Sequence, residues 1–251
     1  MILRGLCALI LLGSVSVVLR PAALAQGAEK PVTGDWLILH SLSDPEQLNP
    51  LTSNDAGASE VLGYIFQSLL TRDPRTLELK PLIAESRPVI SADKLTYTFK
   101  LRRDARFQDG RPVTGEDVLF SVKAIKCPLV NAPFVRVYYD SLVDAQLLDP
   151  GTIRFVTKEP YFLNESVLGG MDVLPRHYYD PQNLLKDVTV KDLNGDPAKL
   201  ADNVKRFAGL FNKGYSRNPM GSGPYKFQVW KTGQEVELVR DPKYWGIGKP
   251  E

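Results

Sequence analysis

The stretch from Leu95 to Val122, LTYTFKLRRDARFQDGRPVTGEDVLFSV, most constrains the fold because its hydrophobic period changes partway along. Residues 95–101 alternate between apolar and polar side chains, which predicts a half-buried strand. Its inward face would consist of Leu95, Tyr97, Phe99 and Leu101. A charged turn around Asp109-Gly110 follows the strand.

The end of the same stretch has helical spacing. Thr114 is a suitable N-cap, and Asp117 three residues later completes an aspartate variant of the capping box. The apolar positions of this predicted helix are Val118, Leu119, Val122 and Ile125. A strand, a polar corner and a capped helix are therefore expected in this order.

The first 25 residues have the features of a secretory signal peptide. Arg4 precedes an apolar run from Leu6 to Leu19, and Ala23-Leu24-Ala25 is a small-residue cleavage site. We expect cleavage before Gln26 and export. An N-terminal membrane anchor is the alternative, but a run of about 14 residues is shorter than the roughly 20 that a spanning helix needs.

Cysteine content and charge exclude several classes of protein. Cys7 lies inside the apolar run, so it is not placed as the acylated cysteine of a lipoprotein, and the mature chain holds only Cys127, which leaves no intrachain disulfide. Cleavage would remove Arg4 and Arg20 and no acid, leaving 29 basic and 29 acidic residues. This balance offers no basic field for nucleic acid, which is not expected as a partner.

The rest of the chain predicts many short elements. Residues 35–40 suit a buried strand and residues 58–70 an amphipathic helix. Residues 152–157 alternate as a strand, and a helix is expected near residues 198–211. Alternation on both sides of WKTGQE predicts a hairpin from Tyr225 to Leu238. Together, these predicted strands and helices indicate an α/β or mixed α+β fold, and the sequence contains no internal repeats.

The inventory of reactive residues gives no catalytic or metal site. The mature chain has only His40 and His177 as candidate bases, and neither lies in a recognisable motif. No cluster of Cys, His and carboxylates has the spacing of a zinc site. The glycines at 169–170 and 221–223 match no phosphate-binding motif and are typical of tight turns. We therefore predict no catalytic residue, no metal and no cofactor.

Residues 95–122 resemble the signature region of the bacterial extracellular solute-binding proteins of family 5, which serve ABC importers of peptides. Other stretches agree in the family's order: DPEQLNPLTSNDAGASEVLGYIFQSLLTRDPRTLELKPLIAES before this region, then LDPGTIRFVTKEPYFL and GSGPYKFQVWKTGQEVELVRDPKYWG after it. The similarity covers essentially all of residues 35–251.

The resemblance implies a periplasmic binding protein type II fold. After the leader at residues 1–25, residues 26–58 would begin the large lobe, residues 59–150 would form the small subdomain, and residues 151–251 would continue the large lobe. Family members are considerably longer, so the chain is expected to be an N-terminal lobe truncated before the second lobe. Most of residues 95–122 would then be scaffold.

The resemblance also implies where a ligand would bind. Family members hold peptides in a cleft between two lobes by hydrogen bonds to the peptide main chain, with hydrated pockets for side chains. By position, the ligand-binding residues expected here are Asp44, Asn49, Phe134, Tyr138, Tyr139, Ser222 and Gly223. Ordinary packing or turn geometry is the alternative for each of them.

The function implied is that of a monomeric binding protein that captures peptides and delivers them to the permease subunits of an ABC importer. Other ligands known in this family, such as nickel complexes, haem, opines or sugars, remain alternatives, as does delivery to a sensory receptor. An exported hydrolase is the alternative from a different class. We expect this chain alone to bind peptides weakly or not at all, because one wall buries little ligand surface.

Overall fold

The computed structural model describes residues 36–246, so the predicted leader and its cleavage site lie outside the described residues. The contacts of the chain separate residues 1–40 from residues 41–251, and each part is described by itself.

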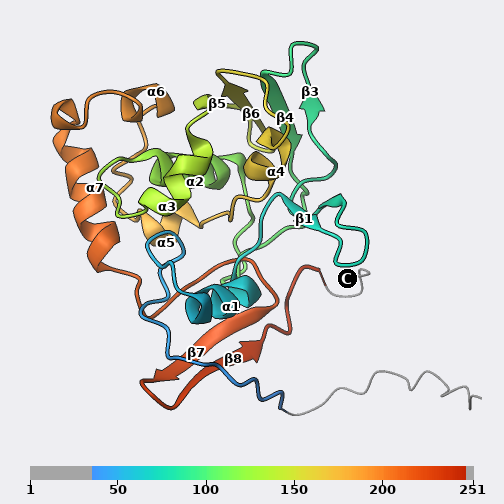
Figure 1. The fold of residues 1–251 in the computed structure, drawn as a ribbon, viewed down its shortest axis with the longest axis vertical. Helices are drawn as coiled ribbons and strands as arrows, with labels where there is room; N and C mark the ends of the chain where they lie inside the picture. Colours follow the sequence, from blue (N-terminus) through green and yellow to red (C-terminus); the bar gives the residue numbers. More distant parts are fainter. Residues whose placement is uncertain (1–35, 247–251) are drawn as a thin grey trace, which may run out of the picture. The chain divides into compact units, whose positions relative to one another are not determined.

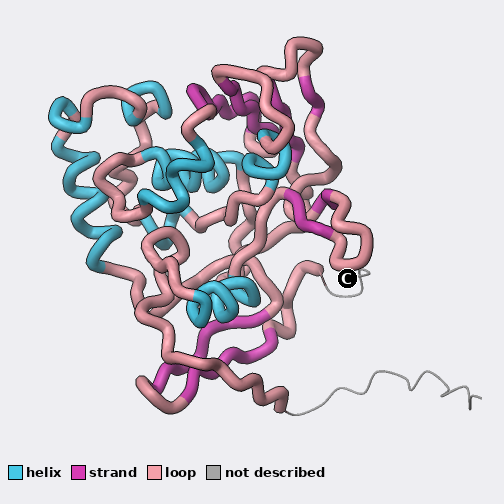
Figure 2. The backbone as a smooth tube through the Cα atoms, in the orientation of Figure 1, coloured by secondary structure: helices cyan, strands magenta, loops and turns pink. Residues whose placement is uncertain are grey.

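Loops join many short elements, as Figure 2 shows. The α-helices are α1 (Ala56–Ile65), α2 (Gly115–Lys126), α3 (Pro133–Arg136), α4 (Asn164–Gly169), α5 (Arg176–Tyr179), α6 (Val190–Leu193) and α7 (Asp202–Lys213). The 3-10 helices are η1 (Val137–Tyr139) and η2 (Pro197–Lys199). The strands are β1 (Leu70–Arg72), β2 (Leu79–Pro81), β3 (Val89–Ile90), β4 (Thr96–Lys100), β5 (Leu142–Asp149), β6 (Thr152–Thr157), β7 (Tyr225–Lys231) and β8 (Glu235–Arg240).

The predicted strand at residues 95–101 is confirmed as β4, which lies inside a four-stranded antiparallel sheet of order β3-β4-β6-β5 (Figure 1). Tyr97, Phe99 and Leu101 are buried, and Leu95 is half-buried. The Phe99 and Phe155 rings on adjacent strands meet edge to face, with centroids 5.7 Å apart. The alternation of side chains therefore fixes which face of the sheet meets the core.

The turn and the capped helix are confirmed as well. Gly110 has φ +89°, a conformation that glycine adopts without strain, and its amide donates to the Phe107 carbonyl at 2.8 Å. At the start of α2, the Thr114 amide and hydroxyl donate to Asp117 Oδ2 at 2.9 and 2.6 Å. The apolar stripe of α2 packs toward β5 and β6.

One hydrophobic core joins this sheet to the helices. The Phe120 ring on α2 meets the Phe207 ring on α7 edge to face, with centroids 5.8 Å apart. Phe207 in turn packs on Phe211 one helical turn later. Both phenylalanines of α7 are buried, so α7 is held by its aromatic face rather than by its polar one.

The predicted hairpin is confirmed as β7 and β8, which pair with each other in a separate two-stranded sheet. The hairpin rests on α1 through β7. The helix predicted near residues 198–211 is confirmed as α7, and the strand predicted at residues 152–157 is β6.

One predicted strand is absent, and one predicted helix is confirmed as α1 but ends earlier than expected. Residues 36–40 form no strand, and the side chains of Trp36, Leu37, Ile38 and Leu39 are exposed. A strand needs ladder partners, and no described strand pairs with these residues. The helix predicted at residues 58–70 ends at Ile65, because the following residues extend and Ser68 pairs with Asp172.

The division into a large lobe and a small subdomain stays a prediction. The sheet that holds β4 runs past residue 150, since β6 pairs with both β4 and β5. Among residues 36–246, no helix combines the length and the hydropathy that crossing a bilayer requires.

Candidate functional site

Asp44 ties the loop before α1 to the hairpin turn. Its Oδ1 accepts from the Trp230 indole nitrogen at 3.0 Å, and its Oδ2 accepts from the Gly233 amide at 2.9 Å. Arg217 lies over the Trp230 ring, with its guanidinium carbon 3.9 Å from the centroid. Both carboxylate oxygens are therefore engaged within the protein.

Asn49 is fully buried near the end of α7. Its Nδ2 donates to the Phe211 carbonyl at 3.2 Å, and its Oδ1 accepts from the amides of Leu51 and Thr52 at 3.0 and 3.1 Å. This side chain satisfies backbone groups of two segments that are far apart in the sequence.

The aromatic segment at residues 134–139 forms α3 and η1. Phe134 and Tyr138 are 67% and 68% exposed, so both rings are available to a ligand. Tyr139 is buried, its hydroxyl donates to the Val167 carbonyl at 3.2 Å, and burial raises the pKa of this phenol. Arg136 fixes the segment to the end of α2 by donating to the Ile125 and Cys127 carbonyls at 3.1 and 2.8 Å.

Ser222 and Gly223 are buried against the end of α1. The Gly223 amide donates to the Ile65 carbonyl at 2.8 Å, and a Cβ at this position would lie 2.4 Å from the Tyr64 carbonyl oxygen. The Ser222 carbonyl accepts from the Trp245 indole at 3.0 Å, while the Ser222 hydroxyl is buried without a partner. One role of these residues is thus to let their backbone pack closely against the end of α1.

The predicted site residues fall into separate groups. Asp44 and Asn49 hold one loop against the hairpin and α7, the aromatic segment lies on α2 and α4, and Ser222-Gly223 lies on α1. Their ligand-binding role stays a prediction. In this structure, Phe134 and Tyr138 are the members with the most exposed side chains.

Asp172 was not singled out from the sequence, although it is the one acid in the apolar run VLGGMDVLP at residues 167–175. It follows α4 and pairs with Ser68 in an isolated antiparallel bridge. Its side chain is only partly exposed, and desolvation raises the pKa of its carboxyl to about 6. An acid interrupting an apolar run is the signal that could have identified it.

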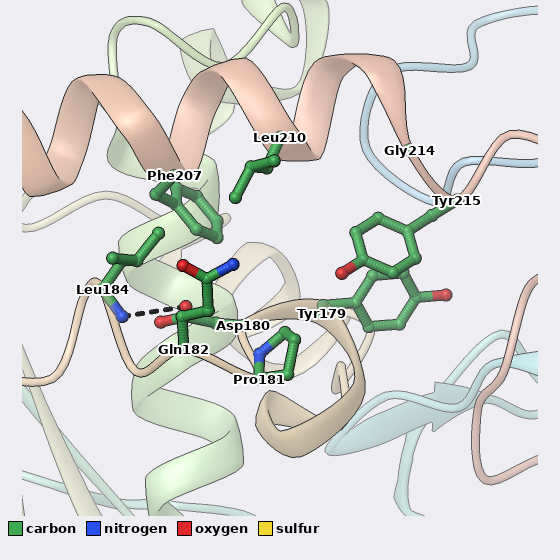
Figure 3. Close-up of a pocket in the computed structure, with 9 residues that line it drawn as sticks. All are labelled: Tyr179, Asp180, Pro181, Gln182, Leu184, Phe207, Leu210, Gly214 and Tyr215. Carbon is green, nitrogen blue, oxygen red and sulfur yellow. Dashed lines mark hydrogen bonds between the residues drawn. The ribbon is translucent and has the colours of Figure 1, made fainter.

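A pocket of about 240 Å³ lies between α7 and the loop after α5, and Figure 3 shows its lining. Phe207 and Leu210 form the α7 side, and the rings of Tyr179 and Tyr215 meet at an interplanar angle of 57° with centroids 4.7 Å apart. Asp180 also lines the pocket, and its carboxylate accepts from the amides of Leu184 and Leu185. None of the seven predicted site residues lines this pocket.

The side chains of His177 and Cys127, which could in principle serve catalysis or metal binding, have structural surroundings in this fold. His177 Nε2 lies 2.6 Å from Asp109 Oδ2, and its ring meets Phe107 edge to face. Cys127 is buried, and burial raises the pKa of its thiol. Within residues 36–246, no group of three His, Cys, Asp or Glu side chains is placed to hold a metal ion.

Comparison with known proteins places the chain in a family. Residues 78–251 match the bacterial extracellular solute-binding proteins, family 5 Middle. Protein XP55 of Streptomyces lividans is 28% identical over 212 residues, which are 84% of this chain and 33% of that protein. The oligopeptide-binding protein AppA of Bacillus subtilis is 26% identical over 234 residues, which are 90% of this chain and 37% of AppA.

Solved structures agree with the sequence matches. AppA in complex with a nonapeptide has a TM-score of 0.61 at 25% identity, over 82% of this chain and 36% of AppA. NikZ from Campylobacter jejuni in complex with Ni(L-His) has a TM-score of 0.59 at 27% identity, over 80% of this chain and 34% of NikZ. The predicted periplasmic binding protein fold is confirmed, and the chain spans about a third of the length of these relatives. Because the family match covers most of its residues, the chain belongs to the bacterial extracellular solute-binding proteins of family 5.

Proposed function

We propose that this chain is part of the substrate-binding component of an ABC importer that captures peptides. The similarity to AppA, whose solved structure holds a nonapeptide, supports this proposal most strongly. A solute-binding role needs no catalytic residue, and in the described part of the chain the His177 ring contacts Asp109 and Phe107.

The proposed role as part of a substrate-binding component implies a cellular setting. The leader at residues 1–25 would export the protein to the periplasm, where a monomer would deliver its ligand to the permease subunits in the membrane. The proposed function requires neither nucleic acid nor a cofactor. The large lobe would comprise residues 26–58 and 151–251, and residues 59–150 would form the small subdomain.

The proposed ligand contacts divide by exposure. Phe134 and Tyr138 would offer ring faces and a hydroxyl directly to a peptide, because their side chains are open to solvent. Asp44, Asn49, Tyr139, Ser222 and Gly223 would shape the wall from within, since their polar groups or backbones are largely engaged. One wall buries little of a peptide, so this chain alone should bind weakly.

Uptake of a labelled peptide by the host tests the function. Disruption of the gene should reduce uptake of a mixed set of radiolabelled tripeptides to pentapeptides, and expression of the native gene should restore it. Unchanged uptake of every peptide in the set after disruption would contradict the proposal.

A matched pair of variants tests the proposed wall. Tyr138→Ala should restore uptake less well than the native gene, because a ring that stacks on the ligand is lost. Phe162→Ala removes a ring that is 83% exposed and lies outside the proposed wall, so it should restore uptake fully. Equal uptake with both variants would remove Tyr138 from the site.

A nickel complex is a second candidate ligand because NikZ, which was solved with Ni(L-His), is 27% identical over 80% of this chain. The same gene disruption measured with radioactive nickel and histidine separates the two candidates. Loss of nickel uptake with unchanged peptide uptake would favour the second.

A further inference from the structure

The pocket between α7 and the loop after α5 is lined by none of the residues of the proposed peptide wall. Its volume is about 240 Å³. An apolar cavity of roughly 150 Å³ in a protein is large enough to hold benzene, whereas drug-sized ligands usually need more than about 300 Å³. A molecule with one aromatic ring and a small substituent therefore matches the size of this pocket.

Most of the pocket wall is apolar. Phe207 and Leu210 line it from α7, and Pro181 lies on the opposite side in Figure 3. The Tyr179 ring closes one end, where it meets Tyr215. Leu210 is 47% exposed, so a ligand in the pocket would cover apolar surface that is otherwise open to solvent.

Three tyrosines gather at this end of the pocket, and their hydroxyl groups differ. Tyr178 donates to the Asn218 carbonyl at 2.6 Å, and the Tyr179 hydroxyl accepts from the Met220 amide at 3.2 Å. The Tyr215 hydroxyl has no hydrogen-bond partner among residues 36–246, and Figure 3 shows it directed into the pocket. Burial raises the pKa of the Tyr215 phenol, so it keeps its proton at neutral pH and can donate.

The backbone at Tyr215 is strained. Its φ is +62°, a left-handed conformation that bulky residues rarely adopt. Hydrogen bonds on both sides enforce it, since the Gly214 carbonyl accepts from Asn49 Nδ2 at 3.4 Å and the Ser216 carbonyl accepts from the Leu48 amide at 2.6 Å. Strain that the surrounding structure maintains in this way is typical of ligand-binding sites.

The side of the pocket that faces Tyr215 is polar. Gln182 stands there in Figure 3, and its side-chain amide, which can donate and accept, has no partner within the described chain. The Asp180 carboxylate adds a negative charge that disfavours an anionic ligand. Both of its oxygens already accept backbone amides, which leaves it less suited to hold a cation. These groups together suit a neutral ligand with a hydroxyl.

We propose that this pocket binds a neutral aromatic molecule of the phenol class, with one ring. The ring would pack against Phe207 and Leu210, and its hydroxyl would bond to the Tyr215 hydroxyl and the Gln182 amide. The site is separate from the proposed peptide wall and does not depend on the proposed function.

Nuclear magnetic resonance of the leucine methyl groups tests the site. Titration of the chain with p-cresol should shift the resonances of Leu184 and Leu210 and saturate at millimolar concentration or below. Methyl resonances that p-cresol leaves unmoved, or that tetramethylammonium moves in its place, would overturn the inference.

Removal of one hydroxyl tests the polar contact. Tyr215→Phe should weaken the binding of p-cresol about fivefold and leave the binding of toluene, which has no hydroxyl, unchanged. Retained toluene binding would also show that the variant is folded. Tyr161→Phe, which changes a ring that is 48% exposed and lies outside the pocket, should leave the binding of both molecules unchanged. Equal p-cresol binding by Tyr215→Phe and the native chain would contradict the proposed contact.

Filling the pocket tests the position of the ligand. Leu210→Trp should occupy the pocket and abolish the binding of p-cresol and toluene. Lys205→Trp places the same ring at an exposed position of α7 that does not line the pocket, so it should bind both molecules like the native chain. Native p-cresol binding by Leu210→Trp would locate the molecule elsewhere and overturn the inference.

Discussion

At the scale of single residues, Asp172 makes stability depend on pH. Its folded pKa of about 6 lies above the unfolded value near 3.8, so its contribution to stability is complete below the unfolded value and is lost as the pH rises through 6. Asp172→Asn should therefore be more stable than the native chain at pH 8, by about 1–3 kcal/mol, and should lose that advantage at low pH. Urea unfolding of both proteins across this pH range measures the difference. A native chain that equals the variant at pH 8 would contradict the raised pKa.

Side-chain chemistry at single positions was hard to foresee from the sequence. The sequence placed Asp44 and Asn49 in a loop, and the structure shows both side chains bonded to segments more than 150 positions away. A polar loop residue that binds a ligand and one that ties distant backbone together look alike in sequence. Asp172 was missed for a different reason, since the desolvation of its carboxyl is visible only in three dimensions.

At the scale of elements, two glycines should respond oppositely to alanine. Gly221 lies against α1, where a Cβ would come within 2.2 Å of the Ile65 carbonyl oxygen, so Gly221→Ala should destabilise the fold. Gly209 is exposed in the middle of α7 and a Cβ there meets nothing within 4 Å, so Gly209→Ala should stabilise the fold by about 0.5–1 kcal/mol. Thermal unfolding of the two variants provides the comparison. Similar shifts in both would show that the contact between Gly221 and α1 does not limit stability.

Strands, caps and turns that depend on neighbouring residues in the sequence were predicted correctly. The alternation of residues 95–101, the Thr114-Asp117 cap and the hairpin turn each contain the information that forms them, and each is observed. The end of α1 was missed because the apolar stripe continues through Phe66 and Leu69, while pairing of Ser68 with Asp172 draws this part of the chain into a ladder. Tertiary contacts override helical periodicity there.

At the scale of the whole molecule, the single core predicts cooperative unfolding of residues 41–246. Phe155 on β6 and Phe207 on α7 belong to the same buried cluster, so Phe155→Ala and Phe207→Ala should each lower the free energy of unfolding by about 3–5 kcal/mol in one shared transition. Phe162→Ala, at an exposed ring, is the control and should change it little. Circular dichroism and tryptophan fluorescence should give coincident curves. Two separate transitions, each moved by one variant, would contradict a common core.

Fold class and family followed from the sequence because several motifs recur in a fixed order, and no single residue decides them. The residues that contact a ligand could not be predicted from the sequence in the same way. Residues such as Tyr138 and Tyr139 are adjacent in the sequence, yet one ring is exposed and the other is buried and bonded to α4. Which of two neighbouring rings faces solvent depends on the turn of a 3-10 helix and on what packs beneath it.

The indole of Trp230 gives this fold a built-in optical reporter. Its nitrogen is held by Asp44 and its face is covered by Arg217, so its emission should depend on whether the loop before α1 stays docked on the hairpin. Release of that loop would expose the ring to water and shift its fluorescence to longer wavelength. With Trp36 and Trp245 replaced by phenylalanine, movements of this part of the protein can thus be followed with light alone, without attaching a dye.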